Sequence, residues 1–585
     1  MEELGGIEWN PLVAQQALTQ AVSKCSNYGL KLATKWAAEQ LVGIETEGVE
    51  GSDELVQETT PTKNNLSTEN GAAAPTTPAG LANQIVFAKS LLDLGEYDRA
   101  AHILSVDGSP KEYLGGLGLF VRAYSLFLAG EKKKEEEMVE LAEPLERSKV
   151  LNPNLEKLRS ELSGSKELNQ LDAFGLYMYG VVLKELLQQE AGSSLEEPPL
   201  SLLHMAKDVF VESILAFPYN WSAWLDLAEI CIENTVIHDD VERALESLTD
   251  SWMYLFFLIH VFCEQQQNDQ ALQVIDRVSL LFPNSNYLKA QTALAYYNLR
   301  DFDRAQEQFL ELCERDPFRL EMIDIFSNIL YVKESKAELS ALAQSVISVD
   351  KYRPEVCCIV GNYYSLKGNH GKAVQYFQRA LKLNRKFLSA WTLMGHEFVE
   401  MRKTSAAIEA YRRAVDINAR DYRAWYGLGQ VYEILNMLLY ALYYYRKAAA
   451  LRPYDARMWC ALGSCFLSLD RRQEAIKSYE RAIVTNDREN IATRKLAKLY
   501  REEGENEKAA RCYQRLVSGS GNEDALDAAE AEAFLFLAQY MKDSGNFDVA
   551  TVYCSRLLEF PGPEKDEAKA LLRDIRSRRI ANQGS

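Results

Sequence analysis

The 585-residue sequence lacks three features that mark membrane, exported and nucleic-acid-binding proteins. No run approaches eighteen apolar residues, so we expect no membrane span. The first ten residues, MEELGGIEWN, contain no basic segment followed by an apolar one, so we expect no secretory signal. Acidic residues outnumber lysine and arginine by 84 to 65, and the net charge of −19 offers no basic footprint for nucleic acid. This charge suits a soluble protein with a large surface for basic partners.

Signals for metal, cofactor and catalytic sites are also missing. The ten cysteines form no C-x-x-C pair, and none of the six histidines stands near a cysteine at zinc-ligand spacing. Neither the phosphate-binding G-x-x-x-x-G-K-[ST] loop nor the G-x-S-x-G nucleophile elbow occurs. We therefore expect no metal, no cofactor and no catalytic residue, and we interpret the cysteines as reduced, half-buried thiols.

What the sequence does contain is a repeat of 34 residues. Its period is set by Gly361, Gly395, Gly429 and Gly463, and three of these glycines follow a tryptophan by four residues. Alanine stands twelve and nineteen positions after each glycine, and an aromatic residue stands sixteen positions after it. These aromatic residues are Phe377, Tyr411, Tyr445 and Tyr479. The pattern is that of the tetratricopeptide repeat, a pair of antiparallel helices.

The sizes of these residues explain the pattern. Glycine and alanine let two helices approach closely, and the aromatic residues fill the gaps between neighbouring hairpins. One hairpin cannot bury its apolar face alone, so hairpins must stack. The same register extends upstream to units that begin near residues 286 and 252, and downstream to a unit near 490 and a last one with Ala538 and Ala550. We therefore predict an all-α fold, a tetratricopeptide-repeat superhelical solenoid of antiparallel helix pairs.

Composition and repeat regularity divide the chain into five segments. An N-terminal helical segment, 1–42, precedes a linker at 43–80 that is rich in glycine, proline, threonine and acidic residues and that we expect to be disordered. An irregular repeat region, 81–251, holds an insertion at 188–201. A regular repeat superhelix with a peptide-binding groove follows at 252–562, and a helix and tail, 563–585, end the chain. In the linker, Thr60 fits the minimal pattern of a proline-directed kinase site.

Long stretches of the repeats resemble one protein family. They are GNYYSLKGNHGKAVQYFQRALKLN (361–384), WTLMGHEFVEMRKTSAAIEAYRRAVDIN (391–418) and DYRAWYGLGQVYEIL (421–435). All three are similar to the eighth subunit of the anaphase-promoting complex, or cyclosome, the cell division cycle protein 23 family. GEYDRAAHIL, FGLYMYGVVLKE and ALLRDIR resemble the family at corresponding places, so the resemblance runs from about residue 80 to 575. KWAAEQLVGIE (35–45) most resembles the plant branch.

The resemblance implies a non-catalytic scaffold subunit of a cullin-RING ubiquitin ligase that controls mitotic progression and exit. It implies a homodimer formed through the N-terminal half of the superhelix, contacts with repeat paralogues and platform subunits, and a location in the nucleus and cytoplasm. The C-terminal half would offer a groove to the N-terminal motif of the activator subunit. No RING-type array of cysteine and histidine occurs here, so ubiquitin transfer would depend on another chain.

The groove should be lined by the first helix of each hairpin, near the glycine position. The candidates are Asn328, Asn362, His396 and Gln430, one residue after that position, with Tyr426 three residues and Arg423 six residues before it. Asparagine and glutamine could clamp the backbone of an extended peptide, and Tyr426 could cover an apolar side chain. The alternative is that these are ordinary hydrated surface residues.

The segment YALYYYRKAA, residues 440–449, holds four tyrosines within six positions. The repeat register predicts that Tyr445 is a core residue between hairpins. Tyr440, Tyr443 and Tyr444 fall off that stripe, on the convex side, and we predict that they form a docking patch for another subunit.

A peptide-binding co-chaperone, or another repeat adaptor, is the alternative to a ligase scaffold, since repeats alone do not fix a role. The co-chaperone clamp needs lysine and arginine side chains that converge on one carboxylate. The matching positions here are Cys358, Ser389 and Thr392, which carry no positive charge. The sequence therefore favours the scaffold.

Overall fold

The structure is a computed structural model that describes residues 9–44, 79–106, 109–111, 114–140, 150–193, 200–233, 235–485, 487, 490–519, 528–558 and 564–583. The chain forms two compact units, Met1–Pro317 and Phe318–Ser585. The predicted boundary between residues 251 and 252 lies inside the first unit, where helices on either side of it are in contact. The predicted all-α repeat fold is confirmed in both units.

The N-terminal unit consists of antiparallel helix pairs and one short strand pair. Its elements are α1 (Pro11–Tyr28), α2 (Lys31–Gly43), α3 (Ala79–Asp93), α4 (Tyr97–Ile103), β1 (Ser105–Val106), β2 (Ser109–Pro110), α5 (Gly115–Glu140), α7 (Leu155–Glu167), α8 (Ala173–Ser193), α9 (Leu200–Ala216), α10 (Trp221–Glu233), α11 (Thr235–Ala244), the 3₁₀ turn η1 (Glu246–Leu248), α12 (Trp252–Glu264), α13 (Asn268–Ser279), α14 (Asn286–Asn298) and α15 (Phe302–Arg315). The hairpins α12–α13 and α14–α15 begin where the repeat register predicts them.

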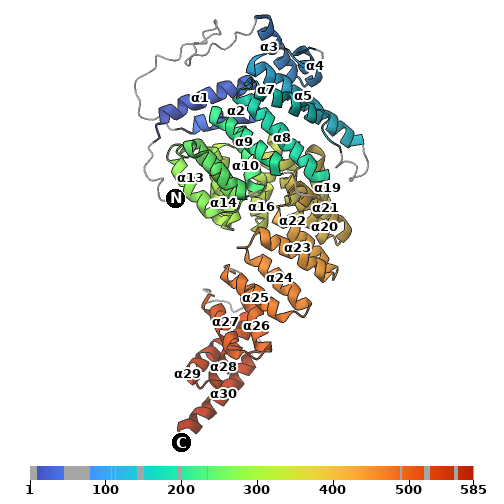
Figure 1. The fold of residues 1–585 in the computed structure, drawn as a ribbon. Helices are drawn as coiled ribbons and strands as arrows, with labels where there is room; N and C mark the ends of the chain where they lie inside the picture. Colours follow the sequence, from blue (N-terminus) through green and yellow to red (C-terminus); the bar gives the residue numbers. More distant parts are fainter. Residues whose placement is uncertain are drawn as a thin grey trace. The chain divides into compact units, whose positions relative to one another are not determined.

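The C-terminal unit is a regular series of hairpins. Its elements are α16 (Ile323–Val332), α17 (Lys336–Asp350), α18 (Pro354–Leu366), α19 (His370–Leu383), α20 (Leu388–Glu400), α21 (Thr404–Ile417), α22 (Tyr422–Ile434), α23 (Leu438–Leu451), α24 (Ala456–Ser468), α25 (Arg472–Val484), α26 (Ile491–Glu502), α27 (Asn506–Gly519), α28 (Ala528–Asp543), α29 (Phe547–Leu557) and α30 (Glu564–Gln583). Each hairpin packs against the next, and from α22 to α30 they follow one another in chain order (Figure 1).

Close contact between a glycine and an aromatic ring joins the two helices of the four hairpins from α18–α19 to α24–α25. A Cβ atom on Gly361 would lie 2.4 Å from the Phe377 ring, and one on Gly429 would lie 2.5 Å from the Tyr445 ring. Gly395 and Gly463 make the same approach to the rings sixteen residues later. A side chain at these positions would push the two helices apart, which explains why the smallest residue recurs there.

In the N-terminal unit, α1 and α2 lie against the first helices of later hairpins. α1 contacts α5, and α2 contacts α10 and α14. Trp36 of α2 stacks on Trp221 of α10, with ring centroids 4.4 Å apart and an interplanar angle of 12°. The Ser285 hydroxyl donates a hydrogen bond to Gln40 Oε1 at 2.6 Å. First helices line the concave face in such repeats, so α2 covers part of that face in the N-terminal unit.

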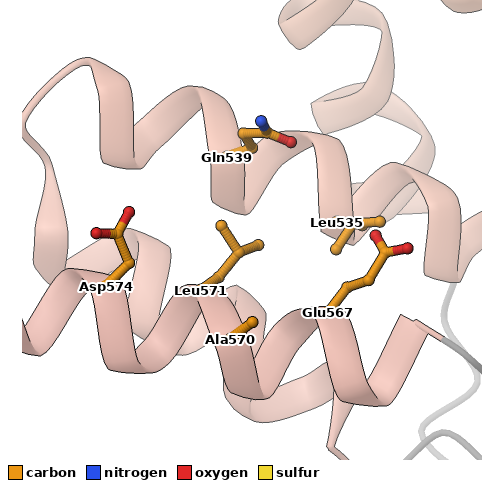
Figure 2. Close-up of a pocket in the computed structure, with 6 residues that line it drawn as sticks. All are labelled: Leu535, Gln539, Glu567, Ala570, Leu571 and Asp574. Carbon is orange, nitrogen blue, oxygen red and sulfur yellow. The ribbon is translucent and has the colours of Figure 1, made fainter.

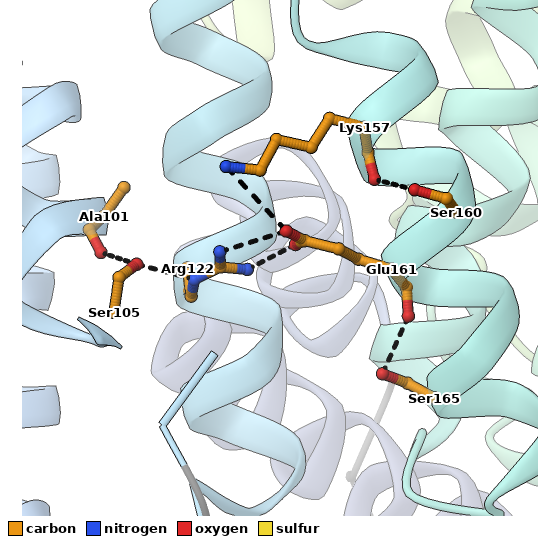
Figure 3. Close-up of polar contacts among 7 residues, drawn as sticks. All are labelled: Ala101, Ser105, Arg122, Lys157, Ser160, Glu161 and Ser165. Carbon is orange, nitrogen blue, oxygen red and sulfur yellow. Dashed lines mark hydrogen bonds and ion pairs between the residues drawn. The ribbon is translucent and has the colours of Figure 1, made fainter. Parts of the chain in front are cut away.

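A buried ion pair joins α5 to α7 in the same unit (Figure 3). Arg122 is 3% exposed and donates to both carboxylate oxygens of Glu161, from Nη1 at 2.6 Å and from Nη2 at 3.3 Å. Its Nε donates to Ser105 Oγ at 2.8 Å, at the start of β1. The fork geometry of arginine thus joins three elements, β1, α5 and α7, around one guanidinium.

Two predicted segments fall partly or wholly beyond what the structure describes. Residues 45–78, with Thr60 among them, lie outside the described residues. In the predicted insertion at 188–201, α8 continues to Ser193 and α9 begins at Leu200, and residues 194–199 lie outside the described ranges. In the described part of the chain, no helix is both long and apolar enough to cross a membrane.

Candidate peptide-binding groove

Polar side chains on the first helices of the C-terminal unit form hydrogen bonds from one repeat to the next. Asn362 of α18 is buried, and its Nδ2 donates to Asn328 Oδ1 at 2.8 Å and to Ser327 Oγ at 2.9 Å. The structure therefore brings two predicted candidates together. Asn362 is not a hydrated surface residue, because both of its amide hydrogens are held by the preceding repeat. Asn328 is half-buried beside it.

A second set of these bonds connects α16, α18 and α20. Ser365 is bonded through Oγ to Tyr331 Oη at 3.2 Å, and it donates to Glu397 Oε1 at 2.6 Å. Glu397 is buried, and its Oε2 lies 2.8 Å from Nδ1 of His370. The carboxylate is thereby held by partners from α18 and α19.

Two carboxylates lie at the start of this face. Asp324 is buried on α16, and Ser389 Oγ of α20 donates to its Oδ2 at 3.3 Å. Burial, and next the negative charge of Glu355, raise the pKa of Asp324 above its usual value. Glu355 Oε2 is buried without a hydrogen bond to any described residue, although Arg353 Nε lies 3.5 Å away. This pair of carboxylates favours a positively charged ligand.

Asp421 links α20 to α22. Its Oδ2 accepts a hydrogen bond from Thr392 Oγ1 at 2.9 Å, and its Oδ1 accepts one from Arg423 Nε at 3.1 Å. Burial opposes ionisation of Asp421, but Arg423 and the hydrogen bonds hold its pKa below the usual value. Arg423, a predicted groove residue, is therefore engaged by a carboxylate of its own repeat.

His396, another predicted groove residue, contacts the second helix of its own hairpin. The ring is half-buried, and its Nδ1 lies 2.7 Å from the Tyr411 hydroxyl. Burial, and next the positive charge of Arg423, lower the pKa of His396 to about 4. The imidazole is neutral at physiological pH, and its tautomer decides whether Nδ1 accepts from the tyrosine hydroxyl or donates to it. His396 is therefore bonded to the hairpin core, and its use in the groove stays a prediction.

The remaining two groove candidates are half-buried residues of α22. The ring of Tyr426 lies 5.4 Å from the ring of Tyr445, and burial raises the pKa of its hydroxyl. Gln430 lies one turn further along the same helix. Tyr426 is thus partly a packing residue, and its use in binding stays a prediction.

The four tyrosines of residues 440–449 divide as the register predicts, with one qualification. Tyr445 is 1% exposed, whereas Tyr440 and Tyr443 are more than half exposed. Tyr444 is half-buried, and its ring stacks on Tyr432 at 5.1 Å. Tyr440 and Tyr443 therefore form the exposed part of the cluster, and Tyr444 supports them.

A pocket lies between α28 and α30 in the C-terminal unit (Figure 2). It is lined by Leu535, Gln539, Glu567, Ala570, Leu571 and Asp574. Asp574 accepts from Lys542 Nζ at 3.0 Å, so one side of the pocket is an ion pair. Among the described residues, no group of three histidine, cysteine or acidic side chains could hold a metal ion.

Sequence reasoning missed the carboxylates Asp324, Glu355 and Glu397. Asp324 stands three residues before Ser327, which takes the glycine position of a degenerate repeat. Aligning that repeat with the regular ones would have placed Asp324 on the same face as Tyr426. Glu397 carried no comparable signal, because its role depends on Ser365 and His370 of the preceding hairpin.

This fold and this face define a tetratricopeptide-repeat scaffold, and comparisons with known proteins agree. The family model described as anaphase promoting complex subunit 8 / Cdc23 matches residues 13–293, and tetratricopeptide-repeat models match residues 354–387, 392–456, 456–483 and 492–525. Anaphase-promoting complex subunit 8 of Arabidopsis thaliana is 46% identical over 576 residues, which cover 95% of each chain. The protein of the same name in Dictyostelium discoideum is 41% identical and covers 96% of this chain and 97% of its own. The chain belongs to the anaphase-promoting complex subunit 8/Cdc23 family.

A solved structure supports the fold alone. The chain is similar to the crystal structure of the APC/C hetero-tetramer Cut9-Hcn1, with a TM-score of 0.53 and 17% sequence identity. The match covers 85% of this chain and 90% of that one. It confirms the repeat solenoid and carries no further conclusion.

Proposed function

We propose that the chain is a non-catalytic scaffold subunit of the anaphase-promoting complex, a ubiquitin ligase that acts in mitosis. Its N-terminal repeat region, 81–251, forms a homodimer, and its surfaces contact repeat paralogues and platform subunits. Its family membership supports this proposal. It works in the nucleus and cytoplasm, which fluorescence microscopy of the tagged chain in dividing cells will test.

The inner face of the C-terminal unit receives the N-terminal motif of the activator subunit. The observation that carries this proposal is the buried Asp324 with the half-buried Glu355 near it, at the start of a face of polar side chains. Two nearby carboxylates favour a cation, and Asn328 has amide hydrogens for an extended backbone. A partner segment with lysine or arginine and an extended backbone fits this face.

Three measurements test the proposal. Light scattering of the isolated chain will give the mass of a dimer; a monomer at micromolar concentration contradicts homodimerisation. The isolated chain with ubiquitin, activating and conjugating enzymes will show no ligase activity. A peptide from the activator N-terminus will bind the wild-type chain, and absence of binding at millimolar peptide contradicts the groove assignment.

The co-chaperone alternative has little support from the geometry. Two of the positions that would need a cation instead carry hydroxyls that donate to carboxylates, Ser389 to Asp324 and Thr392 to Asp421. An acidic C-terminus would meet negative charge there. Co-purification from dividing cells separates the two functions, because ligase subunits and chaperones are readily distinguished.

A further inference from the structure

One hairpin of the C-terminal unit exposes an apolar edge. The α23 patch, as we call it, consists of large side chains that are all more than 40% exposed: Ile434, Leu435, Met437, Leu439, Tyr440 and Tyr443. Ile434 ends α22, and the others lie in the turn that follows and in the first two turns of α23. Leu439 is the most exposed of them, at 70%. Contiguous exposed apolar side chains on a folded domain mark an interaction site.

The neighbouring hairpins provide an internal control for this patch. In each hairpin from α18–α19 to α26–α27, the turn between the two helices has one residue with positive φ. This residue is Asn436 in the α22–α23 hairpin, and its equivalents in the other hairpins are Gly368, Arg402, Asp470 and Gly504. In that register Leu439 corresponds to Gly371, Ser405, Gln473 and Glu507, and Tyr443 corresponds to Gln375, Glu409, Lys477 and Arg511. All eight of these residues are exposed. The repeat fold therefore does not require apolar residues there, and this one hairpin departs from the rule.

The exposed rings are held in place by neighbouring rings. Tyr440 and Tyr444 both stack on the buried Tyr432, at centroid distances of 5.5 and 5.1 Å. Tyr443 meets Tyr444 edge to face at 5.2 Å. Arg412 Nη2 donates to the Tyr432 hydroxyl at 3.1 Å. Rings fixed in this way lose little conformational entropy when a partner binds, as interface anchors require.

The charge around the patch has the opposite sign to that of the whole chain. Residues 370–452 contain fourteen lysines and arginines and six acidic residues, although the net charge of the protein is −19. Helix α23 carries Arg446 and Lys447, both exposed, and no carboxylate. Half of the six acidic residues are engaged inside the unit, namely Glu397 with Ser365 and His370, Asp421 with Thr392 and Arg423, and Glu433 with the Tyr445 hydroxyl. A partner will therefore meet apolar side chains beside cations.

We propose that the α23 patch docks a segment of another protein that presents apolar side chains flanked by aspartate or glutamate. A second copy of this chain does not fit, because a two-fold contact through the patch would set Arg446 and Lys447 against the same cations of its partner. The site lies on the turn and second helix of its hairpin, and the proposal does not rest on the groove function of the first helices.

The test is a photo-crosslinking amino acid in place of Leu439, in the chain assembled into its complex in dividing cells. The matched control carries it in place of Gln473, the exposed residue in register on α25. We expect the Leu439 probe to crosslink to a segment of a different chain that contains apolar residues and carboxylates, with a yield at least tenfold above the control. Crosslinks to a second copy, to a segment without carboxylates, or at the control yield would overturn the proposal.

Charge variants separate the patch from general surface effects. Lys447→Glu will lower the crosslink yield several-fold, whereas Lys477→Glu, the same change on α25, will leave it unchanged.

Leu439→Ser with Tyr440→Ser will lower retention of the chain in the complex and keep the melting temperature of the isolated chain within about 2 °C. An equal loss of folding would show that these residues are core and would contradict the proposal. Binding of the activator peptide serves as the separate measure of the groove, and it will not change.

Discussion

The two units differ in what lies on the first helices of their hairpins. In the N-terminal unit, α2 of the same chain lies on α10 and α14, and Trp36 stacks there on Trp221. In the C-terminal unit, the matching helices carry hydrogen bonds from repeat to repeat and carboxylates such as Asp324. The first face is partly covered by a helix of its own chain, and the second carries polar side chains. The first helices of the same repeat can thus pack against another helix of the chain or carry a polar face, depending on their side chains.

The largest expected effect comes from removing the tryptophan that packs α2 against α10. Trp36 is 5% exposed, and its ring also meets Phe256 edge to face at 5.1 Å. Trp36→Ala removes a large buried side chain and will lower the free energy of unfolding by about 3–5 kcal/mol. Hydrogen exchange will then accelerate in α10 and α14 and remain unchanged in α22.

Two controls sharpen this result. Leu32→Ala changes a residue of the same helix that is 59% exposed, and it will alter stability by less than about 0.5 kcal/mol. Trp36→Phe keeps a ring in place and removes Nε1, which has no hydrogen-bond partner among the described residues, so its effect will be smaller than that of alanine. Unchanged exchange in α10 after Trp36→Ala would mean that α2 does not support this face.

The second effect concerns hairpin packing in the C-terminal unit. A Cβ atom on Gly395 would lie 2.5 Å from the Tyr411 ring. Gly395→Ala will therefore lower the free energy of unfolding by about 1–3 kcal/mol, as other overpacked cores do. Gly371→Ala is the matched control, because nothing lies within 4 Å of its added atom, and it will stabilise α19 by up to about 1 kcal/mol. Equal effects of the two substitutions in thermal unfolding would contradict the packing argument.

Residue register explains what the sequence could predict and what it could not. The 34-residue period determined the hairpins and the burial of Tyr445, because backbone spacing and side-chain size decide both. The polar partners of Asn362 depend on which side chains the preceding repeat happens to carry, so the period alone could not give them. The sequence also could not predict that α2 packs on α10 and α14, because the apolar face of a helix does not identify the helices that it covers.

The third effect tests the polar face directly. Asp324→Asn will weaken binding of the activator N-terminal peptide about tenfold, a change of about 1.4 kcal/mol, because one of the two carboxylates is lost. Glu409→Gln, on the exposed side of α21, removes the same charge elsewhere and will leave binding unchanged. Equal affinity of the wild type and Asp324→Asn, measured by calorimetry, would contradict the groove assignment.

The same substitution, Asp324→Asn, will raise the stability of the chain although it weakens binding. Burial raises the pKa of Asp324 in the folded chain, so the folded state holds its proton more tightly than the unfolded state does. The free energy of unfolding therefore falls as the pH rises from the usual aspartate value through the raised one. At neutral pH, Asp324→Asn will raise the melting temperature while it weakens binding.

The smallest effect is the pH dependence of the His396–Tyr411 bond. The folded-state pKa of His396 is about 4, below the usual value of 6.5, so the unfolded state takes up the proton first as the pH falls. Its contribution to stability is complete above about pH 6.5 and declines between pH 6.5 and 4. For a half-buried ring we expect a loss of about 1 kcal/mol between pH 7 and 5.

His396→Asn, which places here the residue found at 328 and 362, keeps an acceptor for Tyr411 and removes the titration. Its melting temperature will fall less than that of the wild type between pH 7 and 5, and parallel curves would show that His396 does not titrate with folding.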